Sequence, residues 1–470
     1  MPTHDVRHAL DAAALRRLVD AATTGTSRAT GLGVEVELLP LATSPRIRRL
    51  PIATGDGTLA RLSAAPAIQE ALDADQRLDE EGWWSGGDAS SRVTFEPGGQ
   101  LEVSSCYREY PVDALRSVDR ATSLLAASLA PTGARLAAAG LDLWAPGTAT
   151  QQRTTPRYPA MGRYLAARGP AGRTMMRDTC ALQLNLDLSD EQEARQRWLV
   201  ANLLAPLATA TFAASPSTDG GVRSLRSLTW RRVDPTRTGF PPGLTDERVG
   251  LADQLERFAL DADVLLVAEE GGGASPGRPG WRFADWMAHG DARYGWPTTD
   301  DLAVHLSTLF PEVRPRGYLE VRSIDALPAR WRHVPAVLYA GATYDHRSRD
   351  RILEVLRGRP IPLHSQLMSA ATVGVSDPVW CAIAVEVWSF ALEGAARLAR
   401  GSFEPEDLRT AERFLDRFTL RGRAPADELA DVWRAGGPSA ALRWAGEPTS
   451  ELGADASGDT PATSQQEVRR

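Results

Sequence analysis

Four short segments of this chain alternate apolar and polar residues, and their polar sides share one kind of chemistry. They span residues 33–38, 93–104, 181–188 and 318–323, and the second has two arms around Pro97-Gly98-Gly99. Successive side chains of a β-strand point to opposite faces, so each segment predicts a strand with one apolar and one polar face. The polar faces carry carboxylates, amides and one arginine: Glu35 and Glu37; Gln100, Glu102 and Ser104; Gln183, Asn185 and Asp187; Glu320 and Arg322.

A solvent-facing strand more often shows Thr, Lys, Arg or Ser, and neighbouring glutamates on one strand repel each other. Solvation explains any one of these faces alone, but their repetition indicates binding of hard divalent cations. We expect two or three Mg²⁺ ions, held against a nucleoside triphosphate by Glu35, Glu37, Glu102 and Glu320. The amides supply carbonyl ligands or hydrogen bonds to the nucleotide, from Gln183, Asn185 and Gln100.

The basic residues restrict the chemistry further, because all 53 of them are arginine. A chain without lysine has no Walker-A phosphate loop and no Schiff-base or lysine nucleophile. Metal ions and arginines must therefore neutralise any bound phosphates. The seven histidines include none between residues 9 and 288, which disfavours a zinc or Ser-His-Asp hydrolase built on these strands. His305, in an amphipathic segment, is expected in the core.

A second group of candidates lies in the arginine-rich stretch 222–239. Arg231 and Arg232 are typical of a solvated loop. Arg226, Trp230 and Arg237 are spaced differently, with turn-forming residues around the last. Because a guanidinium matches a carboxylate with two parallel hydrogen bonds, these three predict a clamp for an anionic small-molecule substrate.

Helical periodicity occupies the rest of the chain. We expect helices over residues 10–22, two between 112 and 139, one over 189–212 with a Ser189/Gln192 capping box, one from the Asp377 cap, and one over 405–435. Residues 271–280 are expected to form a flexible loop. The sequence predicts one catalytic domain over 1–445, mainly helical over 350–445, and a disordered tail over 446–470.

Composition bears on location and partners. Three separated cysteines and the absence of a signal-peptide pattern predict a reduced, cytoplasmic protein. The apolar stretch 379–398 contains two glutamates and indicates a packed helix rather than a membrane span. A net charge of −7 argues against nucleic-acid binding. We expect small-molecule partners, no membrane, and a monomer or homodimer.

Five ordered motifs give the chain a family likeness. They resemble the plant and bacterial glutamate–cysteine ligases over roughly residues 30 to 350. The matching segments are 33–37, 95–102, 179–187, 225–239 and 310–322. The resemblance implies a glutamine-synthetase-like α+β fold, in which an antiparallel sheet binds magnesium-ATP on its polar face and packs helices on the other. It also implies that glutamate and cysteine are joined through a γ-glutamyl phosphate.

Residue roles follow from the resemblance. Glu35, Glu37, Glu102 and Glu320 are similar to metal ligands, and Arg322 to the group at the transferred phosphoryl. The glutamate pocket would include Arg226, Trp230 and Thr179. Glu96 is either a further ligand or an anchor for the Pro97-Gly98-Gly99 turn.

Some features leave alternatives open. A basic, Gly-containing insertion near residues 44–57 departs from the plant enzymes. The arginine- and alanine-rich composition is similar to the actinobacterial, ergothioneine-pathway branch, and glutathione synthesis is the alternative pathway. A ligase that joins glutamate to another amine, or a non-enzymatic glutamate- or nucleotide-binding protein, are the other hypotheses.

Overall fold

A nine-stranded sheet forms the centre of the molecule. The computed structural model describes residues 10–25, 30–53, 55–72, 79, 82–84, 91–359, 361–398 and 400–449. Its main path runs β10-β11-β7-β1-β5-β4-β3, with β2 and β6 also paired to β1, and the pairing is antiparallel throughout. The strands are β1 (Leu32–Ala42), β2 (Arg48–Arg49), β3 (Trp83–Trp84), β4 (Ser91–Phe95), β5 (Leu101–Ser105), β6 (Ala134–Ala137), β7 (Ala181–Asp187), β10 (Val313–Pro315) and β11 (Tyr318–Asp325).

The strand register brings the four predicted polar faces together. In this register three pairs lie directly opposite each other: Glu37 and Glu102, Glu35 and Gln183, and Asn185 and Glu320. Opposite residues of paired strands project to the same side of a sheet. One continuous polar face therefore extends from β5 across β1 and β7 to β11, which confirms the expected antiparallel sheet.

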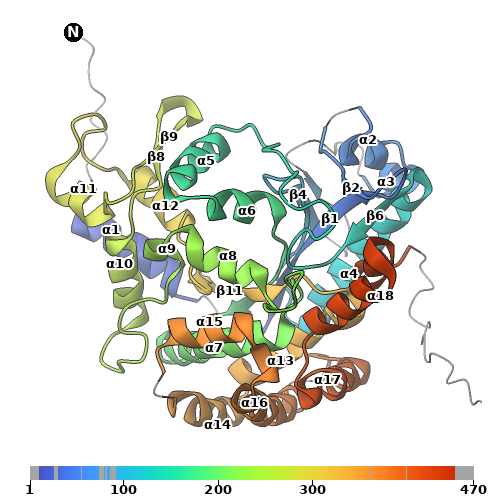
Figure 1. Cartoon of the computed structure of the whole chain (residues 1–470). Coiled ribbons are helices and arrows are strands. Elements are labelled where there is room, and N and C mark those ends of the chain that lie inside the picture. The colour runs from blue at the N-terminus through green and yellow to red at the C-terminus, as the bar shows by residue number, and fades with distance from the viewer. Residues whose placement is uncertain are drawn as a thin grey trace, which may run out of the picture.

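The other face of the sheet is apolar and carries the main core. Val34, Val36 and Leu184 are fully buried there. Helices α4 (Pro111–Leu129) and α7 (Glu191–Phe212) pack against the strands, and α13 (Val334–Tyr344) packs on α7. Figure 1 shows α14 (His346–Arg357), α16 (Pro378–Arg397) and α17 (Pro405–Arg417) below them, whereas α15 (Leu363–Thr372) lies beside α7 and packs against it. Burial of these apolar side chains is the main stabilising contribution to the fold.

Three helices cover the polar face. They are α5 (Arg157–Arg168), α6 (Ala171–Asp178) and α8 (Leu225–Val233), and α5 and α6 lie on the side of the molecule opposite the C-terminal helices (Figure 1). Beside them, a separate apolar core joins α1 (Ala12–Thr23), α10 (Leu251–Asp261), α11 (Phe283–His289) and α12 (Thr299–Ser307). The remaining described α-helices are the short α2 (Thr58–Ser63), α3 (Pro66–Ala71) and α9 (Pro235–Thr238) and the long α18 (Pro425–Ala445).

Two expected helices are interrupted. The chain over 112–139 forms α4 and then strand β6, because a turn at residues 130–132 and Gly133, at φ 75°, end the helix and β6 pairs with β1. The prediction of a second helix there was wrong. Residues 405–435 likewise divide into α17 and α18, separated by a turn that ends at Gly422, at φ 63°.

Two local expectations also needed correction. Helix α7 is capped by Asp190, whose side chain accepts from the Glu193 amide, and Ser189 precedes the cap at φ 67°. Residues 271–280, expected as a flexible loop, contain β9 (Ala274–Pro276), which pairs with β8 (Leu266–Ala268). The Asp377 cap of α16 is confirmed, since Asp377 accepts from the amides of Val379 and Trp380.

Helix α16 is long and apolar enough to cross a membrane by length and composition. In the fold it packs on α13, α14 and α17, and Val387, Trp388 and Ala391 are fully buried. These contacts agree with the expected packed helix. Near the C-terminus, Glu447 is buried and bonds Arg332 at 2.6 Å, so the ordered fold includes this residue. Most of the expected tail, residues 450–470, lies outside the described residues.

Candidate active site

A cavity of about 500 Å³ lies between the polar face of the sheet and the covering helices. Strands β1, β5, β7 and β11 form its floor, and α5, α6 and α8 contribute its roof. Its size is that of a small-molecule site. The sequence-predicted residues in its wall are Glu35, Glu37, Gln100, Glu102, Thr179, Gln183, Arg226, Trp230, Glu320 and Arg322.

Four glutamates form a group on the β1–β5 side of this cavity. Burial, and then their mutual repulsion, raise the pKa of Glu35, Glu37, Glu96 and Glu102 to about 7. Arg226 and Arg322 lower the pKa of Glu37 but do not outweigh these effects. The group therefore has an excess of negative charge that a cation would relieve. Glu96, whose role the sequence left open, belongs to it.

Neutral donors fix the orientation of these carboxylates. The Ala181 amide donates to Glu37 Oε2 at 2.8 Å, and Asn185 Nδ2 donates to Glu35 Oε1 at 2.9 Å. Thr94 Oγ1 donates to Glu102 Oε1, also at 2.9 Å. Such contacts hold the carboxylates in place without neutralising them.

The donor set fits magnesium bound together with a substrate. Among the described residues, no three acidic, histidine or cysteine side chains converge closely enough to enclose an ion by themselves. Magnesium commonly uses one or two protein carboxylates and completes its shell with water and substrate phosphates. The buried Gln100 Oε1, which lines the cavity, also lacks a hydrogen-bond partner and is available as an acceptor, whereas Asn185, predicted to bind the nucleotide, is not among the residues that line the cavity.

Glu320 has a different environment from the other glutamates. Arg314 donates to both of its carboxylate oxygens, at 2.7 and 2.9 Å, and Arg322 approaches to 2.5 Å. Burial alone would raise the pKa of Glu320, but these arginines outweigh it and lower the pKa to about 2. Its role as a metal ligand stays a prediction, and Oε2, which accepts one hydrogen bond, keeps acceptor capacity for an ion.

Arg322 is held at the centre of the cavity wall. Its Nη1 also donates to Gln183 Oε1 at 2.8 Å, and its guanidinium lies 5.2 Å from the ring of Trp230. Trp230 in turn packs edge-on against Phe310, with 5.5 Å between the ring centroids. These contacts place a fixed positive charge opposite the glutamate group.

Arg226 enters the cavity from α8. Its Nη2 donates to the Arg322 carbonyl at 2.9 Å, Asp325 lies 3.7 Å away, and its Nε lacks a partner. Thr179 also lines the cavity, and its backbone carbonyl accepts from Gln100 Nε2 at 2.9 Å. The structure thus brings Arg226, Trp230 and Thr179 to one site, as their substrate-binding assignment requires.

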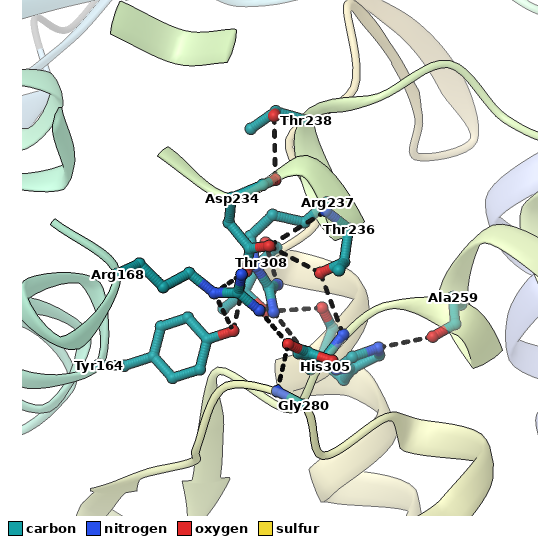
Figure 2. Close-up of polar contacts among 11 residues, drawn as sticks. Tyr164, Arg168, Asp234, Thr236, Arg237, Thr238, Ala259, Gly280, His305 and Thr308 are labelled. Atoms are coloured by element: carbon teal, nitrogen blue, oxygen red, sulfur yellow. Dashed lines mark hydrogen bonds and ion pairs between the residues drawn. The ribbon is translucent and has the colours of Figure 1, made fainter. Parts of the chain in front are cut away.

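The structure does not bring Arg237 to this cavity. Figure 2 shows its guanidinium enclosed in a polar network, and the side chain is fully buried. It donates to Asp234 and to the Thr308 carbonyl, both at 2.8 Å, and to the Asp263 carbonyl. Each of its three nitrogens donates within the protein and Arg237 is not among the residues that line the cavity, so the structure contradicts its assignment as a substrate ligand at this site.

Arg231 also differs from expectation. It is buried rather than solvated, and it pairs with Glu312 at 2.5 Å and donates to the Thr238 carbonyl.

His305 is a core residue as expected: it is fully buried, and its Nε2 lies 2.8 Å from the Ala259 carbonyl. Burial, followed by the charge of Arg237, lowers the pKa of His305 to about 3.

Sequence reasoning did not assign roles to several other cavity residues. They are Arg92, Arg157, Tyr158, Phe310, Arg314 and Arg316. A signal existed for two of them, because Arg314 and Arg316 lie within the matching segment 310–322, just before the Glu320 strand. Arg157 and Tyr158 lie on a roof helix whose position no local pattern reveals.

Comparisons with known proteins identify the family. The profile described as glutamate–cysteine ligase family 2 (GCS2) matches residues 31–447. The glutamate–cysteine ligase EgtA of Mycolicibacterium smegmatis is 33% identical over 75% of this chain and 80% of that protein. The chloroplastic glutamate–cysteine ligase of Medicago truncatula is 29% identical over 78% of this chain and 72% of that protein.

The fold comparison agrees. The structure of the glutamate–cysteine ligase of Francisella tularensis in complex with AMP matches with a TM-score of 0.52 and 13% identity, over 90% of this chain and 88% of that one. At this identity the match concerns the fold, and it confirms the expected ligase architecture. The chain therefore belongs to glutamate–cysteine ligase family 2 and is an enzyme of the ligase class.

Proposed function

We propose that this enzyme joins the γ-carboxyl of L-glutamate to the amine of L-cysteine in an ATP- and magnesium-dependent reaction. The observation that carries the proposal is the charge separation across the cavity. Glutamates of raised pKa lie on β1, β5 and the adjoining turn, and Arg322 and Arg314 lie on β11 and β10. Magnesium bound to the triphosphate of ATP matches the glutamates. The negatively charged glutamate substrate, and the phosphoryl group that it receives, match the arginines.

The proposed reaction has two steps. A glutamate γ-carboxylate oxygen attacks the terminal phosphorus of ATP, ADP leaves, and a γ-glutamyl phosphate forms. The cysteine amine then attacks the acyl carbon, phosphate leaves, and the amine loses a proton as γ-glutamylcysteine forms. Arg322 would stabilise the charge on the transferring phosphoryl oxygens, which grows in the transition state.

Other residues would bind and orient the reactants. Arg226 faces the cavity with a free Nε and would pair with a carboxylate of glutamate. Glu35, Glu37, Glu96 and Glu102 would hold magnesium, which supplies charge neutralisation to the phosphates when bound. The roof residues Trp230 and Phe310 would exclude water from the acyl phosphate.

We extend the proposal to the cell. Relatives named EgtA support a role in ergothioneine synthesis with small molecules as partners, and we expect the enzyme in the cytoplasm. A monomer or homodimer remains our expectation. Deleting the gene and measuring cellular thiols tests this part, and loss of glutathione with unchanged ergothioneine would contradict it.

The decisive experiment measures ADP release and product mass with glutamate, ATP and a panel of amines. We expect cysteine to give the highest kcat/KM, and another amine ranking above it would replace cysteine as the acceptor. Glutamate labelled with ¹⁸O in its γ-carboxyl should transfer one label to inorganic phosphate. Unlabelled phosphate would exclude the acyl phosphate.

A further inference from the structure

A second cavity, of about 430 Å³, adjoins the turn at Pro97-Gly98 and includes part of the basic insertion noted in the sequence. Its wall contains three arginines and no acidic residue: Arg46, Ile47, Arg48, Arg49, Leu50, Pro51, Trp144, Ala145, Thr148, Ala149, Thr150 and Gln152. The chain as a whole carries a net charge of −7. The charged residues in the wall of this cavity are thus all positive, in contrast to the net negative charge of the chain, and this favours an anionic ligand.

The three arginines are available to different degrees. Arg46 is exposed, and Arg48 forms only a half-exposed ion pair with Asp56 at 2.9 Å, which a ligand can replace at low cost. Arg49 is buried and the least available: its Nη1 donates to Asp142 and to the Arg177 carbonyl, its Nη2 donates to the Gly98 carbonyl, and only its Nε has no partner within the described structure. Asp142, 3.3 Å from Arg49 Nη1, is fully buried behind it and accepts from two backbone amides.

An aromatic side chain completes the cavity. Trp144 is partly exposed, and its Nε1 donates to the Pro438 carbonyl at 2.9 Å, which fixes the indole ring. A fixed aromatic face beside arginines is the arrangement that binds a planar ring carrying phosphates. The hydroxyls of Thr148 and Thr150 add hydrogen-bonding groups at the rim.

The same cavity contacts the active site through one turn. Arg49 Nη2 and Gln152 Nε2 both donate to the Gly98 carbonyl, at 3.0 and 2.8 Å. The backbone amide of Gln152 donates to the Pro97 carbonyl at 2.8 Å. The turn from Glu96 to Gly99 carries Glu96 into the active-site wall. A ligand that engages Arg49 therefore acts on residues that hold an active-site carboxylate.

We propose that this cavity is a second nucleotide site, in which Arg46, Arg48 and Arg49 bind the phosphates and Trp144 stacks on the base. Occupation acts on the active site through the Gly98 turn. The probe is ADP, and inorganic pyrophosphate tests the contribution of charge alone.

Binding is measured by equilibrium dialysis of the full chain in EDTA, which removes the divalent cation that the proposed binding of a nucleotide in the active site requires. We expect one ADP per chain, and about tenfold weaker binding in the double variant Arg46→Gln/Arg48→Gln. Arg322→Ala is the matched control and should bind ADP normally. Absence of ADP binding, or equal binding by the double variant, would overturn the site.

Two further comparisons test the ring and the coupling. Trp144→Leu, checked for folding by circular dichroism, should weaken the binding of ADP but not that of pyrophosphate. If the wild type binds ADP and pyrophosphate with equal affinity, the nucleotide assignment is overturned. The kinetic arm rests on the proposed reaction: ADP should lower kcat and raise the KM for ATP in the wild type, and only raise that KM in the double variant. Identical patterns would overturn the coupling, whereas an enzyme inactive with every amine would contradict only the proposed function.

Discussion

Arg314 and Glu320 lie directly opposite each other on β10 and β11, and the guanidinium donates to both carboxylate oxygens at 2.7 and 2.9 Å. On the same sheet face, Glu35 accepts only from neutral amides, at 2.9 and 3.4 Å. The pKa of Glu320 is lowered to about 2, whereas burial and neighbouring carboxylates raise that of Glu35 to about 7. Two glutamates with similar sequence patterns therefore make opposite contributions to the stability of the metal-free protein.

Glu320→Gln should destabilise the folded protein. It leaves Arg314 and Arg322 without their shared counter-charge in a buried position, and loss of one partner of such a pair costs about 3–5 kcal/mol. Urea unfolding measures the effect. A loss below about 1 kcal/mol would show that the pairing contributes as little as an exposed ion pair.

Glu35→Gln should abolish most turnover and leave the fold intact. The substitution removes a hard anionic ligand and also relieves repulsion with Glu102 and Glu320, so unfolding free energy in EDTA should be unchanged or higher. Activity is measured over a magnesium titration. Near-native turnover at limiting magnesium would remove Glu35 from the metal set, and Glu320→Gln is the matched comparison for stability.

The stability of the metal-free protein should fall as pH rises from about 5 to 7.5. The glutamate group binds protons more tightly folded than unfolded, with pKa about 7 against an unfolded value near 4.3, so folding is favoured on the acid side. Thermal unfolding with EDTA and with magnesium plus a non-hydrolysable ATP analogue measures this. A pH slope unchanged by the metal nucleotide would assign it to other groups.

A second titration overlaps the upper end of that range. His333 lies 2.7 Å from both Asp119 and Asp407, and these carboxylates outweigh burial and raise its pKa to about 9. Its contribution to stability is complete below about pH 6.5 and is lost as pH rises through 9. Above about pH 6.5 His333 therefore adds to the slope, and below it the glutamate group acts together with Asp178, whose pKa burial and then Asp142 raise to about 6.

Arg226→Lys should raise the KM for glutamate more than tenfold and change that for ATP little. An ammonium is a point charge and cannot replace a guanidinium that contacts the Arg322 carbonyl and a substrate carboxylate together. Steady-state kinetics with each substrate varied in turn measures the split. Equal increases in both KM values would indicate a general structural role.

Arg322→Ala should bind magnesium-ATP and glutamate but form the acyl phosphate about a hundredfold more slowly. A fixed positive charge at a transferring phosphoryl group is commonly worth about 3 kcal/mol in the transition state. Rapid-quench measurement of the first turnover tests this in protein that is folded by circular dichroism. A wild-type rate would end the assignment of Arg322 to catalysis.

Much of the sheet could be predicted from the sequence. Alternation along 33–38, 181–188 and 318–323 places Glu35, Gln183 and Glu320 on polar faces, because the side-chain period of a strand depends only on local geometry. The ordered motifs also indicated the family, which the profile over residues 31–447 confirms. Strand β6 was missed because its alanine-rich sequence favours a helix and only pairing with β1 makes it a strand.

What the sequence by itself determined was therefore the chemistry of each strand face; tertiary structure decided which charged groups meet. Arg237 and Arg226 lie on the same arginine-rich stretch, yet Arg226 reaches the cavity and Arg237 bonds the Thr308 carbonyl, 71 residues away. Glu320 and Glu35 differ in the same way, because Arg314 reaches only the first. A local pattern fixes the direction of a side chain, but its charge state and partners depend on groups brought close by the fold, through burial and short-range electrostatics.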